Sequence, residues 1–241
     1  MHKQFPVVLV TSPPLREQAE ALLREYVPEG SVLVWRQGDG EACAAIRTAI
    51  LSGAWALCIS FYNDYIFSSD EIHALGCIVN IHPALPMLRG RGYDILPLLE
   101  NHREHGVTLH FVSEAIDAGH IIDVIKQPIP RDIQYPAFRV RNQELSLAML
   151  ERFLKRCRHA DIAQLSRELR LADAASGFSW SGPLVTSAKL GGMLREWRRN
   201  EPDHPQLRHV PRALESGHAD GSPQAIGTDG PRATARGDAT G

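Results

Sequence analysis

The chain of 241 residues is long enough for one sizeable domain with an appendage. Its formal net charge of −2 gives no strong field toward nucleic acid or an anionic membrane. Its apolar stretches fall short of the roughly 18–20 residues that a membrane span needs, and its start lacks the apolar core of a signal peptide. The four cysteines form no CxxC pair, which suits a reducing compartment. We therefore predict a cytoplasmic protein without a nucleic-acid or membrane partner.

The first part of the chain alternates short apolar runs with amphipathic ones. Apolar runs without polar alternation, separated by helices, indicate a parallel sheet that is buried on both faces. The expected strands are Pro6–Val10, Ser31–Trp35, Trp55–Phe61 and Ile78–Ile81, and the expected helices between the first three are Pro14–Tyr26 and Gly40–Leu51. The predicted fold class is α/β, with an open, mostly parallel Rossmann-like sheet and helices on both faces, in which ligands bind beyond the carboxyl ends of the strands.

The pattern continues after the fourth strand and then weakens. The expected elements are a helix near Tyr93–His102, strands at Gly106–Val112 and Ile121–Gln127, and a long helix over about Pro136–Arg158. We therefore place the main α/β domain at residues 1–160 and a small extension, packed on the core, at 161–203. Residues 204–241 are rich in Pro, Gly, Ala and charge and carry few large apolar side chains, so we expect a disordered tail there.

Two polar side chains stand at the end of the fourth strand. Asn80 and His82 are two residues apart, so an extended chain points both to the same side. Pro83 and Pro86 then end the strand. Taken alone, such a pair commonly serves only the loop backbone.

A second segment reads as strand, loop and strand over 106–122, and its loop carries one acid close to Gly119. One helix and one strand separate Asp117 from His82, so Asp117 can return to the same edge of the sheet. The two segments together place an amide, an imidazole and a carboxylate at one site.

These segments resemble the folate-dependent formyltransferase family, which includes phosphoribosylglycinamide and sugar N-formyltransferases. The match covers roughly residues 55–127: Asn-x-His-Pro ending in Leu-Pro, a nearby Arg-Gly, then Gly-Val-Thr-x-His-x-Val ahead of Asp-x-Gly. The resemblance implies that Asn80, His82 and Asp117 form the catalytic group. It also implies formyltetrahydrofolate as co-substrate and a small-molecule amine as acceptor.

The chemistry of formyl transfer suits these three residue types. Attack of an amine on a formyl carbon builds negative charge on oxygen, and N–H donors from Asn80 and His82 are suited to stabilise it. Asp117 can hold the imidazole in its useful protonation state or accept the amine proton. The sequence leaves open whether that proton moves directly or through water.

The resemblance also implies two sets of binding residues. The folate pocket is expected from the loop after the third strand and from the strand ahead of the acid, with contacts from Tyr62, Asn63, Asp64, Tyr65, Ile66, Val112 and Ile116. Asp64 is unusual in a loop that faces a pterin, and we expect it to point to solvent. Contacts with the acceptor, or with the folate tail, are expected from Arg89, Arg91, His110, Thr11 and Ser12. No metal is expected, because formyl transfer needs none.

Several functions stay open at this point. The acceptor can be an amino sugar nucleotide or an amino-acid-like metabolite. A formyltetrahydrofolate deformylase, which hydrolyses the same folate, and a non-catalytic folate-binding module are the alternatives. Phosphoribosylglycinamide is not expected as acceptor, because the loop Thr11–Arg16 carries two prolines and no glycine. The sequence leaves the oligomeric state open, a homo-oligomer included.

Overall fold

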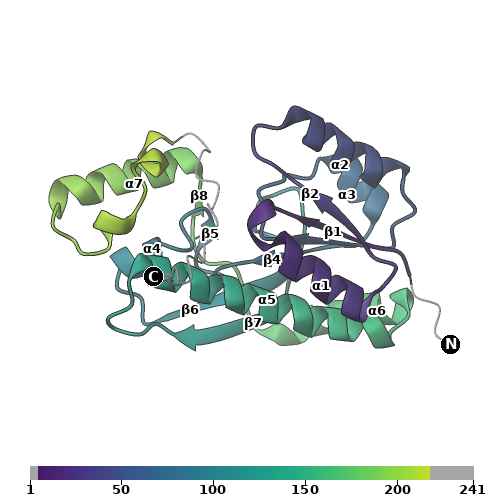
Figure 1. Ribbon diagram of the computed structural model, residues 1–241. Coiled ribbons are helices and arrows are strands. Elements are labelled where there is room, and N and C mark those ends of the chain that lie inside the picture. The colour runs from purple at the N-terminus through teal and green to yellow at the C-terminus, as the bar shows by residue number, and fades with distance from the viewer. Residues whose placement is uncertain (1–4, 218–241) are drawn as a thin grey trace, which may run out of the picture.

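The computed structural model describes residues 5–217 (Figure 1). The strands are β1 (Val7–Thr11), β2 (Ser31–Val34), β3 (Leu57–Phe61), β4 (Ile78–His82), β5 (Arg89–Gly90), β6 (Glu104–Phe111), β7 (Ile121–Pro128) and β8 (Leu184–Val185). The helices are α1 (Arg16–Tyr26), α2 (Gly40–Ser52), α3 (Ser69–Leu75), α4 (Leu96–Leu99), α5 (Tyr135–His159), α6 (Ile162–Ser176) and α7 (Ser187–Asn200). Short 3₁₀ turns are η1 (Pro13–Leu15), η2 (Leu207–His209) and η3 (Arg212–Ser216).

The main sheet has six strands in the order β2-β1-β3-β4-β6-β7. The pairs among β2, β1, β3 and β4 are parallel, whereas β6 runs antiparallel to both β4 and β7. The predicted α/β class with a mostly parallel sheet is confirmed, and the antiparallel strands form one side of it. Because β2, β1, β3 and β4 are parallel, their carboxyl ends lie at one edge of the sheet, and the strand order reverses there between β1 and β3.

Helices cover both faces of the sheet, as the alternation along β1 requires. Val7 and Leu9 pack with α1 and α5, whereas Val8 and Val10 face the opposite way and pack with α2 and α3. Figure 1 shows α1 beside α5 on one face and α2 with α3 on the other. None of the helices in the described chain combines the length and hydrophobicity that a membrane crossing needs.

Two helices differ from the sequence-based expectation. The helix expected near Tyr93–His102 is only α4, and Asn101 just beyond it has a φ of 53°, which is incompatible with a continuing helix. The unexpected α3 begins with a capping box, in which Ser68 and Glu71 each bond the other's backbone N–H. That Ser-x-x-Glu signal was present in the sequence.

The C-terminal segment packs against β5, α4 and α5, contrary to part of the expected tail. β8 pairs with β5, and α7 packs with α4 and the start of α5 in a separate apolar cluster. Leu207 and Val210, 1% and 4% exposed, belong to this cluster. Disorder from residue 204 is therefore wrong for 204–217, because these two side chains anchor the segment. Residues 218–241 lie outside the described residues.

We predict that Leu207→Ala lowers the free energy of unfolding by about 2–5 kcal/mol, because it leaves a cavity in the cluster around α7. Leu171→Ala is the matched control, since Leu171 is 69% exposed and should change stability little. Urea unfolding of the full chain measures both. A loss at Leu207 no larger than at Leu171 would contradict the docking of this segment.

Candidate active site

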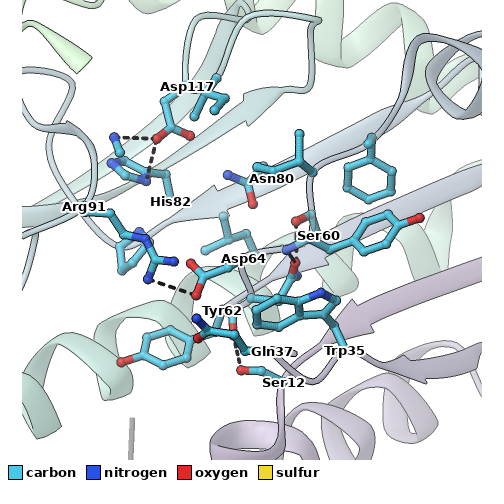
Figure 2. A pocket seen from close by; sticks show the side chains of 18 of the residues that line it. Ser12, Trp35, Gln37, Ser60, Tyr62, Asp64, Asn80, His82, Arg91 and Asp117 are labelled. Carbon is cyan, nitrogen blue, oxygen red and sulfur yellow. Dashed lines mark hydrogen bonds and ion pairs between the residues drawn. The ribbon is translucent and has the colours of Figure 1, made fainter. Parts of the chain in front are cut away.

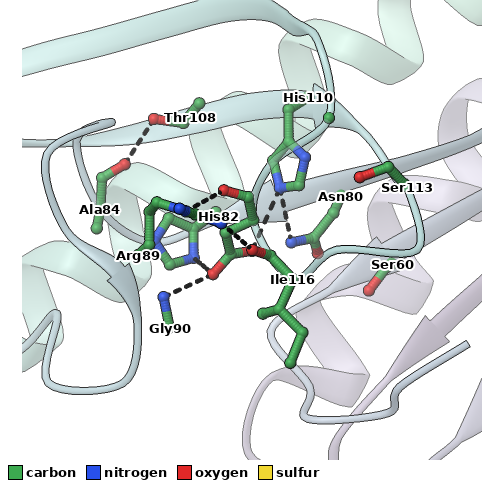
Figure 3. Close-up of polar contacts among 12 residues, drawn as sticks. Ser60, Asn80, His82, Ala84, Arg89, Gly90, Thr108, His110, Ser113 and Ile116 are labelled. Atoms are coloured by element: carbon green, nitrogen blue, oxygen red, sulfur yellow. Dashed lines mark hydrogen bonds and ion pairs between the residues drawn. The ribbon is translucent and has the colours of Figure 1, made fainter. Parts of the chain in front are cut away.

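A row of polar side chains crosses three strands at the open edge of the sheet. Ser60 on β3 pairs in register with Asn80 on β4, and Asn80 pairs with His110 on β6. His82 follows two residues after Asn80 and therefore lies on the same face. Figure 3 shows Asn80, His82 and His110 close to the loop that carries Ile116.

Asp117 joins the two histidines. Its Oδ2 lies 3.4 Å from Nδ1 of His82, and its Oδ1 lies 3.5 Å from Nε2 of His110. Oδ2 also accepts the backbone N–H of Gly90 at 2.7 Å. The residue sits in the left-handed region with a φ of 44°, which costs energy for a non-glycine residue and is offset by these contacts. Asn80, His82 and Asp117 are thus brought together as predicted, while their chemical roles stay predictions.

Arg89 holds the Asp117 loop rather than facing the cavity. Its Nε donates to the carbonyl oxygen of Asp117 at 2.7 Å, and its Nη2 donates to that of Ile116 at 2.9 Å. Next to it, Gly90 has a φ of 80°, and a Cβ there would lie 2.3 Å from the carbonyl oxygen of Val185. The expected substrate contact of Arg89 is therefore corrected, because its guanidinium is used to fix the loop that carries the acid.

The hydrogen bonds of His82 define its neutral form. Nε2 lies 2.6 Å from the carbonyl oxygen of Leu88, which can only accept, so Nε2 carries a hydrogen. Nδ1 is then unprotonated in the neutral ring and faces Asp117. We expected His82 to donate to a substrate oxygen; both ring nitrogens instead face protein groups, which makes Nδ1 a proton acceptor.

The same reasoning orients Asn80. Nδ1 of His110 donates to the carbonyl oxygen of Phe111 at 2.8 Å, so Nε2 of the neutral ring is an acceptor. Nδ2 of Asn80 lies 3.1 Å from that Nε2. An amide nitrogen has two hydrogens, so one N–H of Asn80 bonds His110 and the second remains a donor toward the cavity.

The pKa values of His82 and Asp117 indicate which groups of this cluster are charged. Burial lowers the pKa of His82 below its ordinary value of 6.5, and the nearby carboxylate of Asp117 only partly offsets that effect. Burial alone would raise the pKa of Asp117, but the charge that His82 carries when it is protonated at low pH, the contact with His110 and the N–H of Gly90 lower it to about 2. At neutral pH the acid is therefore ionised and His82 is neutral.

These side chains open into a cavity of about 1390 Å³ (Figure 2). Single-ligand pockets are usually about 300–1,000 Å³, so this cavity has room for two ligands. Asn80, His82, His110 and Asp117 all line it. Its walls are the β3–α3 loop, the loop before Asp117, the β2–α2 loop and the start of α7.

Two exposed isoleucines contribute apolar surface to the lining. Ile66 is 64% exposed on the β3–α3 loop, and Ile116 is 41% exposed beside Asp117. Val112 lines the same part of the cavity, and its backbone N–H bonds Ile78. Large apolar side chains left uncovered in a cavity are suited to the faces of a flat ring.

Other predicted members of the β3–α3 loop shape the loop itself. Asn63 donates to the carbonyl oxygen of Val10 at 2.8 Å, and its Oδ1 accepts the backbone N–H of Tyr65 at 2.8 Å. The hydroxyl of Tyr65 donates to Glu71, and the hydroxyl of Tyr62 accepts from Gln143 at 3.2 Å. These residues line the cavity, but their polar atoms bond the protein.

Two of the expected residues, Asp64 and Thr11, differ from the prediction, whereas Ser12 lines the cavity as expected. Asp64 does not point to solvent, because its carboxylate pairs with Nη1 of Arg91 at 2.9 Å. Both residues line the cavity. Thr11 is fully buried and does not line the cavity, so its predicted substrate contact is contradicted. Ser12 does line it, and its hydroxyl donates to the carbonyl oxygen of Tyr62.

Some lining residues were missed from the sequence. Trp35 and Gln37 follow β2 at the same edge, a position that the strand pattern could have indicated. Tyr93 and the segment 185–187 reach the cavity only through tertiary packing, for which one sequence holds no local signal. Within residues 5–217, no three His, Cys, Asp or Glu side chains are grouped to hold a metal ion.

Comparison with known proteins supports this description. The chain matches no protein-family model. It is 40% identical over 75 residues to phosphoribosylglycinamide formyltransferase of Haemophilus influenzae. The matched stretch covers 30% of this chain and 35% of that protein. The match therefore spans about a third of that relative's length. It confirms the resemblance to folate-dependent formyltransferases that the motifs indicated.

Solved structures share the fold at low identity. The formyltransferase PseJ of Anoxybacillus kamchatkensis, in complex with a UDP-linked formamido sugar and tetrahydrofolate, aligns with a TM-score of 0.56 and 16% identity over 86% of this chain and 99% of that one. A formyltetrahydrofolate deformylase of Pseudomonas syringae aligns with a TM-score of 0.53 and 17% identity over 63% of this chain and 60% of that one. The chain thus has the formyltransferase fold, which occurs in both transferases and a hydrolase.

We predict that NMR titration of the histidines gives His82 a pKa below 6.5, because burial disfavours its charged form. Asp117→Asn should lower this pKa further, since it removes the carboxylate that stabilises the imidazolium. The control Asp70→Asn changes an acid that is 78% exposed and paired with Arg47, so it should leave the titration of His82 unchanged. A rise in the pKa of His82 on Asp117→Asn would contradict the electrostatic account.

Proposed function

We propose that this protein transfers a formyl group from formyltetrahydrofolate to a small amine. The observation that carries the proposal is the cluster of Asn80, His82 and Asp117 at the edge of a cavity large enough for two ligands. An ionised acid beside a neutral imidazole, with an amide N–H directed outward, is the set of groups that acyl transfer to an amine requires.

The residues that line the cavity suit the flat ring of a folate. Ile66 and Ile116 leave apolar surface uncovered there, and the β3–α3 loop is fixed by Asn63, so a slot for a flat heterocycle is already formed. When bound, the folate supplies the formyl group beside the polar cluster.

The roles of the three residues follow from their protonation. Asn80 directs its second N–H at the formyl oxygen, where negative charge develops during attack. Nδ1 of neutral His82 accepts the proton that the attacking amine loses, directly or through a water molecule. Asp117 stabilises the imidazolium that results, because its carboxylate lies 3.4 Å from that nitrogen. The imidazolium then returns the proton to the folate nitrogen as the bond from that nitrogen to the formyl carbon breaks, which releases tetrahydrofolate and restores neutral His82.

The acceptor is a small amine that enters beside Ser12, Arg91 and Tyr93. A UDP-linked formamido sugar is bound to the neighbour PseJ, which supports an amino sugar nucleotide as one class to test. An amino-acid-like metabolite is the other class.

Hydrolysis of the folate is the second candidate function, because a deformylase has the same fold. The same cluster could activate water in place of an amine. Incubation with formyltetrahydrofolate, with and without candidate amines, separates the cases. Tetrahydrofolate released only with an amine supports the transferase, formate released without one indicates the hydrolase, and no release indicates a binding module.

Substitution of the cluster tests the proposed roles. Asn80→Ala should lower kcat by about 10²–10³-fold, the usual cost of losing one donor to a developing oxyanion. His82→Ala and Asp117→Asn should abolish turnover, while circular dichroism shows a folded protein. His102→Ala is the control, because His102 pairs with Glu100 outside the cavity. Near-normal rates in any of the three cluster variants would refute the assigned mechanism.

Phosphoribosylglycinamide should be a poor acceptor. Pro13 and Pro14 supply no backbone N–H after β1, and the hydroxyl of Ser12 already donates to Tyr62. The loop therefore lacks the glycine-rich backbone that would receive a ribose phosphate. A measured kcat/KM of about 10⁴ M⁻¹s⁻¹ or more with this acceptor, the range of a dedicated enzyme, would overturn the prediction.

A further inference from the structure

Trp180, in the segment between α6 and β8, contacts the histidine pair from outside the cavity. Its ring centroid lies 4.9 Å from that of His110 at an interplanar angle of 89°, and 5.8 Å from that of His82 at 63°. Trp180 does not line the cavity. It therefore covers the two imidazoles on a side that no ligand in the cavity reaches.

The indole also bonds the loop that carries the acid. Nε1 of Trp180 donates to the carbonyl oxygen of Gly119 at 2.7 Å, two residues beyond Asp117. The loop is pressed against β6 at that point, since a Cβ on Gly119 would lie 1.8 Å from the carbonyl oxygen of Phe111. One side chain thus contacts both histidines and the loop that carries Asp117.

Backbone contacts hold the rest of the segment that carries Trp180 close to the site. β8 pairs with β5, so Val185 faces Gly90, whose N–H bonds Asp117. Gly182 lies against Met87, where a Cβ would be 1.8 Å from the carbonyl oxygen. These close contacts hold the segment of Trp180 in one place relative to the sheet edge.

We propose that Trp180 is a positioning residue, which holds His82, His110 and the Asp117 loop in the arrangement used for formyl transfer. The catalytic part of this inference rests on the proposed function. The segment after α6 would then be part of the active site, although it lies outside the region of motif resemblance.

The physical effect is exclusion of water together with orientation. His110 and His82 are 2% and 4% exposed, and the indole is part of what covers them. Asp117, His110 and the ring of Tyr93, 6.3 Å away, are the titratable side chains that face His82. Removing the indole admits water to His82 and removes one hydrogen bond that holds the Asp117 loop. Burial has a larger effect on the pKa of His82 than the charge of Asp117, so the net change in that pKa should be a rise.

The test compares Trp180→Leu and Trp180→Phe with the control Trp197→Phe, which changes a tryptophan that packs on His204 away from the site. We expect Trp180→Leu to lower kcat about 10- to 100-fold, as displaced catalytic groups do. The KM for formyltetrahydrofolate should not change, because Trp180 does not touch the cavity. Trp180→Phe keeps a ring but loses the N–H, so its loss of kcat should be smaller.

NMR titration of His82 in the same variants does not depend on the reaction. The pKa of His82 should rise toward 6.5 in Trp180→Leu and stay unchanged in Trp197→Phe.

A folded Trp180→Leu protein with unchanged kcat and unchanged titration overturns the proposal. If Trp180→Leu does not fold, an unchanged kcat and titration in Trp180→Phe overturns it. If no variant and no wild-type protein transfers formyl groups, a raised pKa still supports the positioning role while the proposed function fails.

Discussion

The carboxylate of Asp117 is the group on which the polar cluster depends. Its two oxygens meet His82, His110 and the N–H of Gly90, and its backbone carbonyl is held by Arg89. The strained φ of this residue is kept because so many contacts fix it. A charge in that position makes a protonated His82 less costly in a buried site, and in the proposed reaction this allows the neutral imidazole to accept a proton.

Much of the fold and the centre of the site could be predicted from the sequence. Asn80 and His82 stand two residues apart at the end of a continuous apolar run, which fixes their common face once the strand is recognised. Asp117 is the acid in a loop between two runs that read as strands, and those strands do return to the same edge. Local patterns therefore located the three polar residues, while their function came from the motif resemblance.

The missed parts depend on tertiary contacts. Arg89 lies in an Arg-Gly motif that suits anion binding, yet the carbonyls of Ile116 and Asp117 take both of its bonds. Thr11 ends a strand beside Ser12, but its side chain turns into the protein. Trp180 and Leu207 lie in segments with weak periodicity, and only packing against the sheet edge and α4 shows what they contact. Sequence periodicity does not report such long-range contacts.

The most direct test of this account is the titration of the Asp117 carboxyl, followed by the ¹³C chemical shift of its side chain in the full-length protein. We predict a pKa of about 2, so that the group remains ionised while exposed aspartates titrate. A pKa at or above the ordinary value of 3.8 would mean that burial outweighs the contacts with His82, His110 and Gly90. Such a result would contradict the arrangement of charges on which the proposed formyl transfer rests.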